Sequence, residues 1–318
     1  MALISKLTAI AEAIRNKTGK TDLLTLEQMP VEIAAIETGG GSSEGGDTGV
    51  EDALIQRANT LTEYSNDRVT EVGQYALAIL SYLRNVDLPN VTKVNDYAFY
   101  QDYYLTNVNL PNATWIGYSA FYNCDSALKS LILPKAEVIG NSAFSYCETV
   151  EKIILPKVTG DITLNTFAYC KALTEIILPF VTTMTGRLIF RDCAALKTVI
   201  LPSVTELGYS SYNGAIFHAC TALEALILPG DTVCTLKYTE GTFGRASTSG
   251  ACSIVEGTGY IYVPKAKLST YKAATNWTTY SAQFRAIEDY PEICAAVLNA
   301  DGTIKTAEEI SAEMEASI

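Results

Sequence analysis

The stretch AFSYCETVEKIILPKV, residues 143–158, returns along the chain with small changes. The related stretches are AFYNCDSALKSLILPKA, TFAYCKALTEIILPFV, IFRDCAALKTVILPSV and IFHACTALEALILPG. Each of them places a cysteine three residues after a phenylalanine and ends in a Leu-Pro pair. A phrase that occurs five times is a unit of architecture and not a single site.

The Leu-Pro pairs give the period of this unit. They begin at Leu88, Leu110, Leu133, Leu155, Leu178, Leu201 and Leu228, with separations of 22, 23, 22, 23, 23 and 27 residues. The phenylalanines keep the same interval, at Phe99, Phe121, Phe144, Phe167, Phe190 and Phe217. A period between about 20 and 50 residues is the signature of a solenoid. The sequence therefore predicts an array of stacked repeats.

The residues before each Leu-Pro pair read as a short strand. Residues 150–155 alternate in polarity and are rich in β-branched side chains, and the following proline cannot continue a ladder. We expect an α/β solenoid with one short parallel strand per repeat, stacked about 4.8 Å apart. In this repeat the residues expected to face the core are Phe144, Cys147, Ile153, Leu155 and Val158.

The repeat IGNSAFSYCETVEKIILPKV, residues 139–158, resembles the BspA-like leucine-rich repeat, and the resemblance covers roughly residues 60–287. It implies a leucine-rich-repeat solenoid that serves in binding, in bacteria as a surface adhesin. Residues 261–277 are similar to the segment that closes such arrays. Because the end of a solenoid exposes half a core, we expect Tyr271 and Trp277 to form a cap.

Outside the repeats, which we place at residues 50–287 with a capping repeat at each end, the chain has three further parts. Residues 1–38 form a predicted helical hairpin, whose apolar stripe is Leu3, Leu7, Ile10 and Ile14. Two such helices cannot bury enough surface alone, so this hairpin is predicted to anchor the protein or to make it oligomeric. Residues 39–49, GGGSSEGGDTG, are a flexible linker. Residues 288–318 are an acidic tail, with a capping box at Thr306 and Glu309 before a last helix.

Composition excludes several kinds of partner. The 318 residues are 48% hydrophobic and 18% charged, and the formal net charge is −12 with scattered lysines, which argues against nucleic acid and anionic membranes. The chain has no apolar run of about 18 residues, so no membrane insertion is expected, and no signal peptide is recognised. We expect no nucleic-acid partner.

The residues that could carry chemistry form no recognisable catalytic set. The eight cysteines follow the repeat period and not a metal-binding spacing, so packing is favoured over a thiol ladder. His218, the single histidine, follows a repeat phenylalanine, where other repeats hold Tyr100, Tyr122, Ser145, Ala168 and Arg191; we expect this variable position to be exposed. No motif places paired carboxylates. We therefore expect no cofactor, no metal and no enzymatic activity, with a glycan-active enzyme as the alternative.

Two rows of side chains are the candidates for contact with a partner. Strand alternation sends one isoleucine per repeat to the outer face of the sheet: Ile132, Ile154, Ile177, Ile200 and Ile227. The alternative is that these residues stabilise the strand ladder. The second row is Tyr100, Tyr122, Tyr146 and Tyr169, which lies around the turns and either binds a partner or covers the convex side.

A second resemblance concerns the function. The stretch ISKLTAIAEAIRNKTGKTDLLTLEQMPVEIAAI, residues 4–36, is similar to N-terminal segments of bacteriophage and prophage structural proteins. It implies a virion component of the tail-fibre or receptor-binding type, made in the bacterial cytoplasm, that recognises a host-cell surface receptor, protein or glycan. Residues 1–38 would then join virion structural proteins or further copies of the chain, with a homo-oligomer expected and a trimer favoured. The alternative is an adhesin on the bacterial cell surface.

Overall fold

The computed structural model describes residues 61–125, 127–210, 214–244 and 250–318. The chain divides into two compact units, Met1–Leu61 and Thr62–Ile318. The predicted helical hairpin at residues 1–38 and the linker at residues 39–49 lie outside the described residues. The described strands and helices all belong to the second unit.

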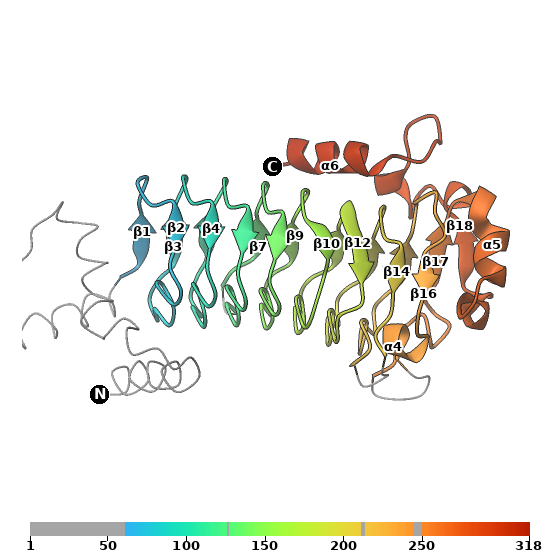
Figure 1. Cartoon of the computed structure of the whole chain (residues 1–318), viewed down its shortest axis with the longest axis horizontal. Coiled ribbons are helices and arrows are strands. Elements are labelled where there is room, and N and C mark those ends of the chain that lie inside the picture. The colour runs from blue at the N-terminus through green and yellow to red at the C-terminus, as the bar shows by residue number, and fades with distance from the viewer. Residues whose placement is uncertain (1–60, 126, 211–213, 245–249) are drawn as a thin grey trace, which may run out of the picture. The chain divides into compact units, whose positions relative to one another are not determined.

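The unit Thr62–Ile318 is a solenoid of parallel strands, as the repeat period predicts (Figure 1). Its first row of strands is β1 (Glu63–Ser65), β3 (Asn85–Asp87), β5 (Asn107–Asn109), β7 (Ser130–Ile132), β9 (Lys152–Ile154), β11 (Glu175–Ile177), β13 (Thr198–Ile200), β15 (Ala225–Ile227), β17 (Tyr260–Val263) and β18 (Phe284–Ala286). These strands form a three-stranded sheet, β1 to β5, and a seven-stranded sheet, β7 to β18. The prediction of one strand per repeat is confirmed for this row.

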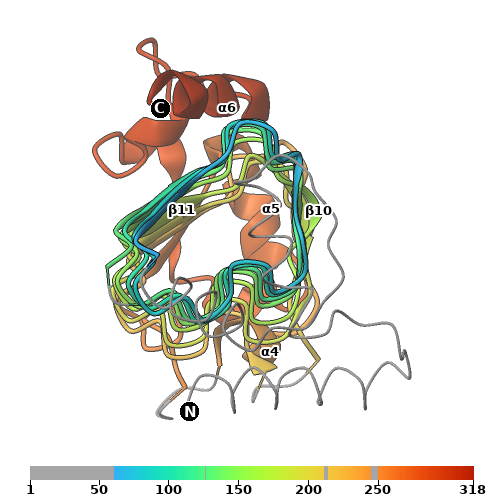
Figure 2. The ribbon, with the colours of Figure 1, turned by 90° about the vertical axis from the view of Figure 1, so that its left-hand side faces the viewer.

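A second row of strands lies on another side of the coil (Figure 2). It consists of β2 (Glu71–Val72), β4 (Lys93–Val94), β6 (Trp115–Ile116), β8 (Val138–Ile139), β10 (Thr159–Asp161), β12 (Phe180–Met184), β14 (Glu206–Leu207) and β16 (Thr235–Leu236). The row forms two four-stranded sheets. It was not predicted from the sequence because most of these strands have only two residues, too few to show alternation.

Stacked phenylalanines fill the core between the two rows. Neighbouring rings from Phe99 to Phe243 have centroids between 4.9 and 5.9 Å apart and are nearly parallel. All seven phenylalanines are fully buried. Phe243, at the end of α4 (Glu240–Phe243), extends the row beyond the six that the sequence pattern shows. Because each ring touches the next, the core is continuous along the array.

The repeat cysteines lie beside the phenylalanines. Cys124, Cys147, Cys170, Cys193 and Cys220 are buried free thiols. Each thiol donates a hydrogen bond to the backbone carbonyl of the phenylalanine one repeat earlier, with Sγ–O distances of 3.0 to 3.2 Å. Burial raises the pKa of Cys147 to about 12. The packing role is confirmed, and the structure adds a reason for cysteine: its thiol gives a buried carbonyl a second partner.

The predicted cap closes the C-terminal end of the array. It comprises η2 (Lys265–Lys267), α5 (Leu268–Ala273) and η3 (Trp277–Tyr280). The indole N–H of Trp277 donates to the Cys234 carbonyl at 2.7 Å, and the Tyr271 hydroxyl accepts from the Cys234 N–H at 2.9 Å. The Trp277 ring is fully buried and lies 6.3 Å from the Phe243 ring. The two aromatic residues chosen from the sequence therefore form the lid.

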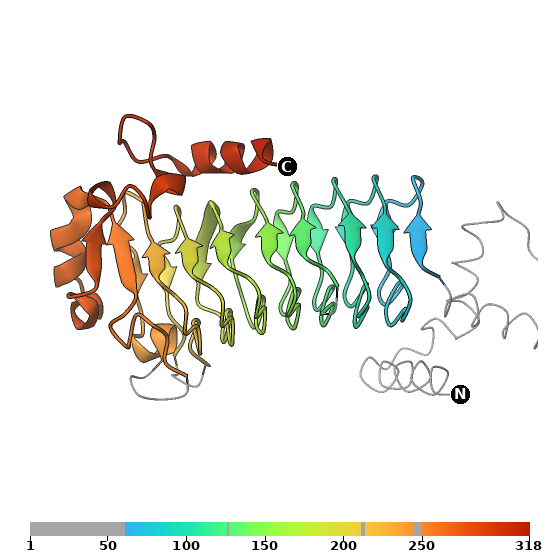
Figure 3. The same cartoon turned by 180° about the vertical axis from the view of Figure 1, so that it is seen from behind.

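Residues 288–318, which we call the terminal segment, turn back along the array (Figure 3). The segment begins within η4 (Ile287–Asp289) and continues through η5 (Ala295–Val297), an antiparallel bridge between Leu298 and Ile304, and α6 (Ala307–Ala316). The expected capping box is present, because the Thr306 side chain accepts from the Glu309 N–H and the Glu309 carboxylate accepts from the Thr306 N–H.

Candidate functional site

The terminal segment covers much of the isoleucine row. Cys294, Val297 and Ile310 join one apolar cluster with Ile200 and Ile227 of the first strand row. Further apolar residues of the segment pack against this cluster: Ala296, Leu298, Ile304 and Met314. The outer face of β11 to β17 is therefore an internal interface of the chain.

Three members of the isoleucine row are covered, a point that strand alternation alone leaves open. Ile154, Ile200 and Ile227 have only 4%, 1% and 0% of their surface exposed. Strand alternation does point them outward from the core, but the terminal segment lies over them. Ile132 and Ile177 are half-buried. A role of the row in binding a partner stays a prediction.

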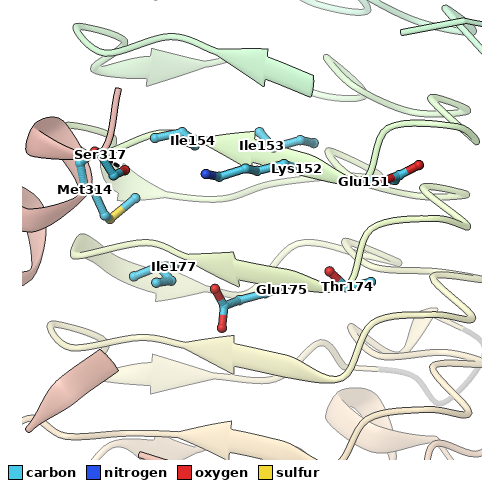
Figure 4. A pocket seen from close by; sticks show the side chains of 9 residues that line it. All are labelled: Glu151, Lys152, Ile153, Ile154, Thr174, Glu175, Ile177, Met314 and Ser317. Carbon is cyan, nitrogen blue, oxygen red and sulfur yellow. Dashed lines mark hydrogen bonds between the residues drawn. The ribbon is translucent and has the colours of Figure 1, made fainter. Parts of the chain in front are cut away.

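Polar contacts fix α6 to the array. The Ser311 hydroxyl donates to the Pro156 carbonyl at 3.0 Å, and Glu315 forms an ion pair with Lys157. Beside these contacts a pocket of about 280 Å³ remains between the end of α6 and strands β9 and β11 (Figure 4). The volume of this pocket is slightly below about 300 Å³, the lower limit typical of ligand pockets. Its lining combines apolar and charged side chains, among them Ile154, Met314 and Glu175.

The predicted tyrosine row exists as a line of ring contacts on the turn side. Tyr100 and Tyr122 stack with centroids 5.1 Å apart and an interplanar angle of 16°. Tyr122 and Tyr146 are 5.2 Å apart and tilted by 49°, and Tyr146 and Tyr169 are 4.2 Å apart at 15°. All four side chains are half-buried. The structure therefore brings together the four tyrosines chosen from the sequence.

Three more tyrosines extend this row. Tyr75 and Tyr97 stack at 4.6 Å, Tyr97 meets Tyr118 edge-on at 5.1 Å, and Tyr97 meets Tyr100 edge-on at 5.5 Å. We call the seven residues the tyrosine surface: Tyr75, Tyr97, Tyr100, Tyr118, Tyr122, Tyr146 and Tyr169. Tyr75 could not be connected to the others from the sequence because it lies in a degenerate first repeat.

The tyrosine row depends on an unusual backbone. Tyr100 and Tyr122 directly follow their repeat phenylalanines, whereas Tyr146 and Tyr169 lie one residue further on. Tyr146 and Tyr169 have positive φ values of 61° and 62°. This left-handed conformation is uncommon for a bulky side chain. Gln101 and Asn123, at the same position in the repeats of Tyr100 and Tyr122, have φ values of 60° and 62°. The repeats therefore share one backbone conformation, and the rings meet although they stand at two different sequence positions.

The expectation that the position after the phenylalanine is exposed is wrong in two repeats. Ser145 and Ala168 hold this position and are buried, with 2% and 1% of their surface exposed. The left-handed residue that comes next takes the outward place instead. His218 at the same position is half-buried, and burial lowers its pKa. Its Nδ1 atom is buried without a hydrogen-bond partner among the described residues.

Charged groups at the end of the tyrosine row are paired. The Arg191 guanidinium lies over the Tyr169 ring, 5.2 Å from its centroid, and its Nε donates to Asp192 at 3.0 Å. In the neighbouring repeats Lys171 and Glu148 form an ion pair at 2.8 Å. Within the described ranges no group of three or more His, Cys, Asp or Glu residues is arranged to hold a metal ion. The helices of the same ranges include none long and apolar enough to cross a membrane.

Comparison with known proteins identifies the repeat. A model of the BspA-type leucine-rich repeat region matches in six copies over residues 56–135 and 92–224. No curated protein sequence matches the chain.

Comparison with solved structures finds three leucine-rich or related proteins. A leucine-rich repeat protein from Bacteroides ovatus is 20% identical, with a TM-score of 0.47, and the match covers 74% of this chain and 63% of that one. A leucine-rich cell surface protein from Faecalibacterium prausnitzii is 19% identical, with a TM-score of 0.32 and coverage of 72% and 73%. The pneumococcal vaccine antigen PcpA is 15% identical, with a TM-score of 0.40 and coverage of 71% and 66%. The chain thus spans less than two thirds of the first of these proteins.

Proposed function

The chain belongs to the BspA-type leucine-rich repeat family, and from this premise we propose that it is a non-enzymatic binding protein that contacts a receptor on a host-cell surface. The observation that carries the proposal is the tyrosine surface, seven half-buried or exposed side chains joined by ring contacts over consecutive repeats. Tyrosine supplies a large amphipathic contact area at a low cost in entropy. A solenoid multiplies that area along its length.

The proposal includes a place for the protein in a virion. Residues 1–38 attach it to virion structural proteins of a phage or prophage, or to further copies of the chain as a homo-oligomer, with a trimer favoured. Support comes from the sequence similarity of residues 4–36 to such proteins and from the glycine-rich linker after them. The second candidate is an adhesin on the bacterial cell surface, which membership of the BspA-type family supports. Both use the repeats for binding.

Loss of two central rings is expected to weaken cell binding. In a Tyr122→Ala, Tyr146→Ala variant, binding to intact bacterial cells, measured by flow cytometry with fluorescent protein, should fall more than about tenfold, because removal of one central aromatic anchor costs about 2 kcal/mol or more. Tyr238→Ala is the matched control, since Tyr238 is 47% exposed and is not one of the seven residues of the tyrosine surface. Thermal denaturation confirms that both variants are folded. Equal binding by the double variant and the wild type would contradict the proposal.

Removal of the N-terminal hairpin tests the anchor. Deleting residues 1–38 is expected to convert an oligomer into a monomer, measured by light scattering, because the apolar stripe of Leu3, Leu7, Ile10 and Ile14 is lost. The melting transition of the repeats should stay unchanged. If the protein is a monomer before deletion and joins no virion assembly, or stays oligomeric after deletion, the anchor is elsewhere.

A further inference from the structure

The ring faces of the tyrosine surface are mostly used within the protein. Tyr100, Tyr122 and Tyr146 each stack or tilt against the next ring of the row, and Arg191 lies over Tyr169. A ligand therefore meets ring edges and hydroxyl groups more than open ring faces. The edge of an aromatic ring carries the positive end of its quadrupole and favours contact with oxygen atoms.

The hydroxyl groups offer both donors and acceptors. The phenol groups of Tyr75, Tyr97 and Tyr118 lie close enough to raise the pKa of Tyr97, after burial as the first cause. Burial, the first cause, raises the pKa of Tyr122 to about 12, so this phenol stays protonated at neutral pH. A protonated phenol both donates and accepts a hydrogen bond. The hydroxyl groups of a sugar have the same dual capacity.

The charges around the surface disfavour an anionic ligand. Asp96 lies beside the Tyr97 ring and raises its pKa after burial and the neighbouring tyrosines. The cations at the other end, Arg191 and Lys171, are paired with Asp192 and Glu148. A polyanion would meet these carboxylates, and Arg191 and Lys171 are already paired. The ligand that fits is uncharged.

The spacing of the rings favours a repeating ligand other than an extended peptide. The row Tyr100, Tyr122, Tyr146 and Tyr169 advances by 5.1, 5.2 and 4.2 Å per ring. An extended peptide places side chains on one side only every 6.6 to 6.8 Å, roughly twice its rise per residue. Its side chains would soon lose register with the rings. A polymer of sugar rings has a unit about as long as the distance between neighbouring tyrosines.

We infer that the tyrosine surface binds an uncharged polysaccharide lying along the solenoid axis, with the tyrosine hydroxyls bonded to sugar oxygens. The inference rests on the proposed binding function and names its receptor class. It assigns different parts of each side chain to different tasks: the rings hold one another in line, and the hydroxyls make the specific contacts.

Removal of the hydroxyls alone tests the inference. In a Tyr122→Phe, Tyr146→Phe variant the stacked rings remain, but cell binding should still fall more than about tenfold, because each lost hydrogen bond leaves a polar sugar group unpaired. Tyr238→Phe, which changes an exposed tyrosine outside the surface, should bind like the wild type. Wild-type binding by the double Phe variant would overturn the inference.

Treatment of the cells separates the inference from the proposed function. Mild periodate, which cleaves vicinal diols of sugars, should abolish binding of the wild-type protein, and protease treatment of the cells should leave it intact. The uncharged polysaccharide purified from the same cells should compete in solution. If protease alone abolishes binding, the receptor is a protein and the inference fails, while loss of binding by the double Ala variant would still support the proposed function.

Discussion

Deletion of residues 291–318 is expected to make the repeat array self-associate. The deletion uncovers Ile200, Ile227 and Tyr262, which are now almost fully buried in one cluster with the terminal segment. Each such side chain contributes about 1.5–3 kcal/mol when it leaves water. The uncovered row would run along consecutive strands of a sheet, and a contiguous apolar patch of this kind promotes association. Light scattering and binding of an apolar dye should both rise strongly relative to the full chain.

A pair of polar substitutions should then be harmful in the full chain, where it lowers stability, and beneficial in the truncated chain, where it raises solubility. In the full chain, Ile200→Asn with Ile227→Asn is expected to lower the free energy of unfolding by about 2–5 kcal/mol per site, since the amides are forced beneath the terminal segment. In the truncated chain the same pair should restore solubility. The natural precedent is β5, which carries Asn109 at the equivalent outward position.

The comparison of outcomes decides the role of the segment. A truncated protein that scatters light like the full chain would show that the isoleucine row does not need a cover. Asparagine substitutions that destabilise both proteins equally would assign the row to the strand ladder, the alternative considered from the sequence. The experiment uses four proteins: the full chain and the truncated chain, each with isoleucine or with asparagine at both positions. Proteins of equal length differ only at these two outward positions.

The outward positions of the first strand row change from polar to apolar along the sequence. They read Asp87 and Asn109 in β3 and β5 and then become isoleucine from Ile132 onward. The change follows the part of the array that the terminal segment covers. Contacts such as that of Ser311 with Pro156 join residues 155 positions apart. They do not recur with the repeat period, so they leave no pattern in the sequence. The solenoid was predictable because its contacts recur in every repeat, whereas the contacts of the terminal segment occur only once.

The tyrosine surface could be predicted only in part. The four rings from Tyr100 to Tyr169 stand out in the sequence because each follows a repeat phenylalanine by one or two residues. Tyr146 and Tyr169 have a left-handed backbone that residue preferences disfavour, so the contact between rings at the two positions could not be read from the sequence. The cross-repeat hydrogen bonds supply the stabilisation that local preference does not, as the Tyr146 N–H bond to the Ala168 carbonyl shows.

Replacement of Asp102 by cysteine is expected to stabilise the protein at neutral pH. Asp102 takes the place of the repeat cysteine and is fully buried. Its Oδ1 accepts from the Leu80 N–H at 2.7 Å, but its Oδ2 has no hydrogen-bond partner among the described residues. A buried polar atom left unpaired costs about 1–3 kcal/mol. Asp102→Cys removes that atom and restores the thiol found in the next five repeats. It also removes the acceptor of the Leu80 N–H, so the expected gain is what remains after that loss.

The gain from Asp102→Cys should depend on pH. Burial raises the pKa of Asp102 well above its ordinary value, and the Leu80 hydrogen bond opposes this only in part. Because the folded-state pKa is the higher one, the folded protein holds the proton more tightly than the unfolded chain. The stability that this proton provides is complete below the unfolded pKa and is lost as the pH rises through the folded pKa. The variant should therefore exceed the wild type most at neutral pH, and the difference should shrink toward the ordinary pKa of an aspartate, about 4.

Thermal denaturation over this pH range measures the effect. Asp102→Asn is the informative second variant, because it keeps an acceptor for the Leu80 N–H but cannot ionise, so it should share the loss of pH dependence. Asp87→Asn changes an exposed carboxylate of the first strand row and serves as the control. A stability difference between wild type and Asp102→Cys that stays constant with pH would mean that the folded and unfolded chains bind the same number of protons at Asp102, so that burial does not raise its pKa and its cost arises from packing alone.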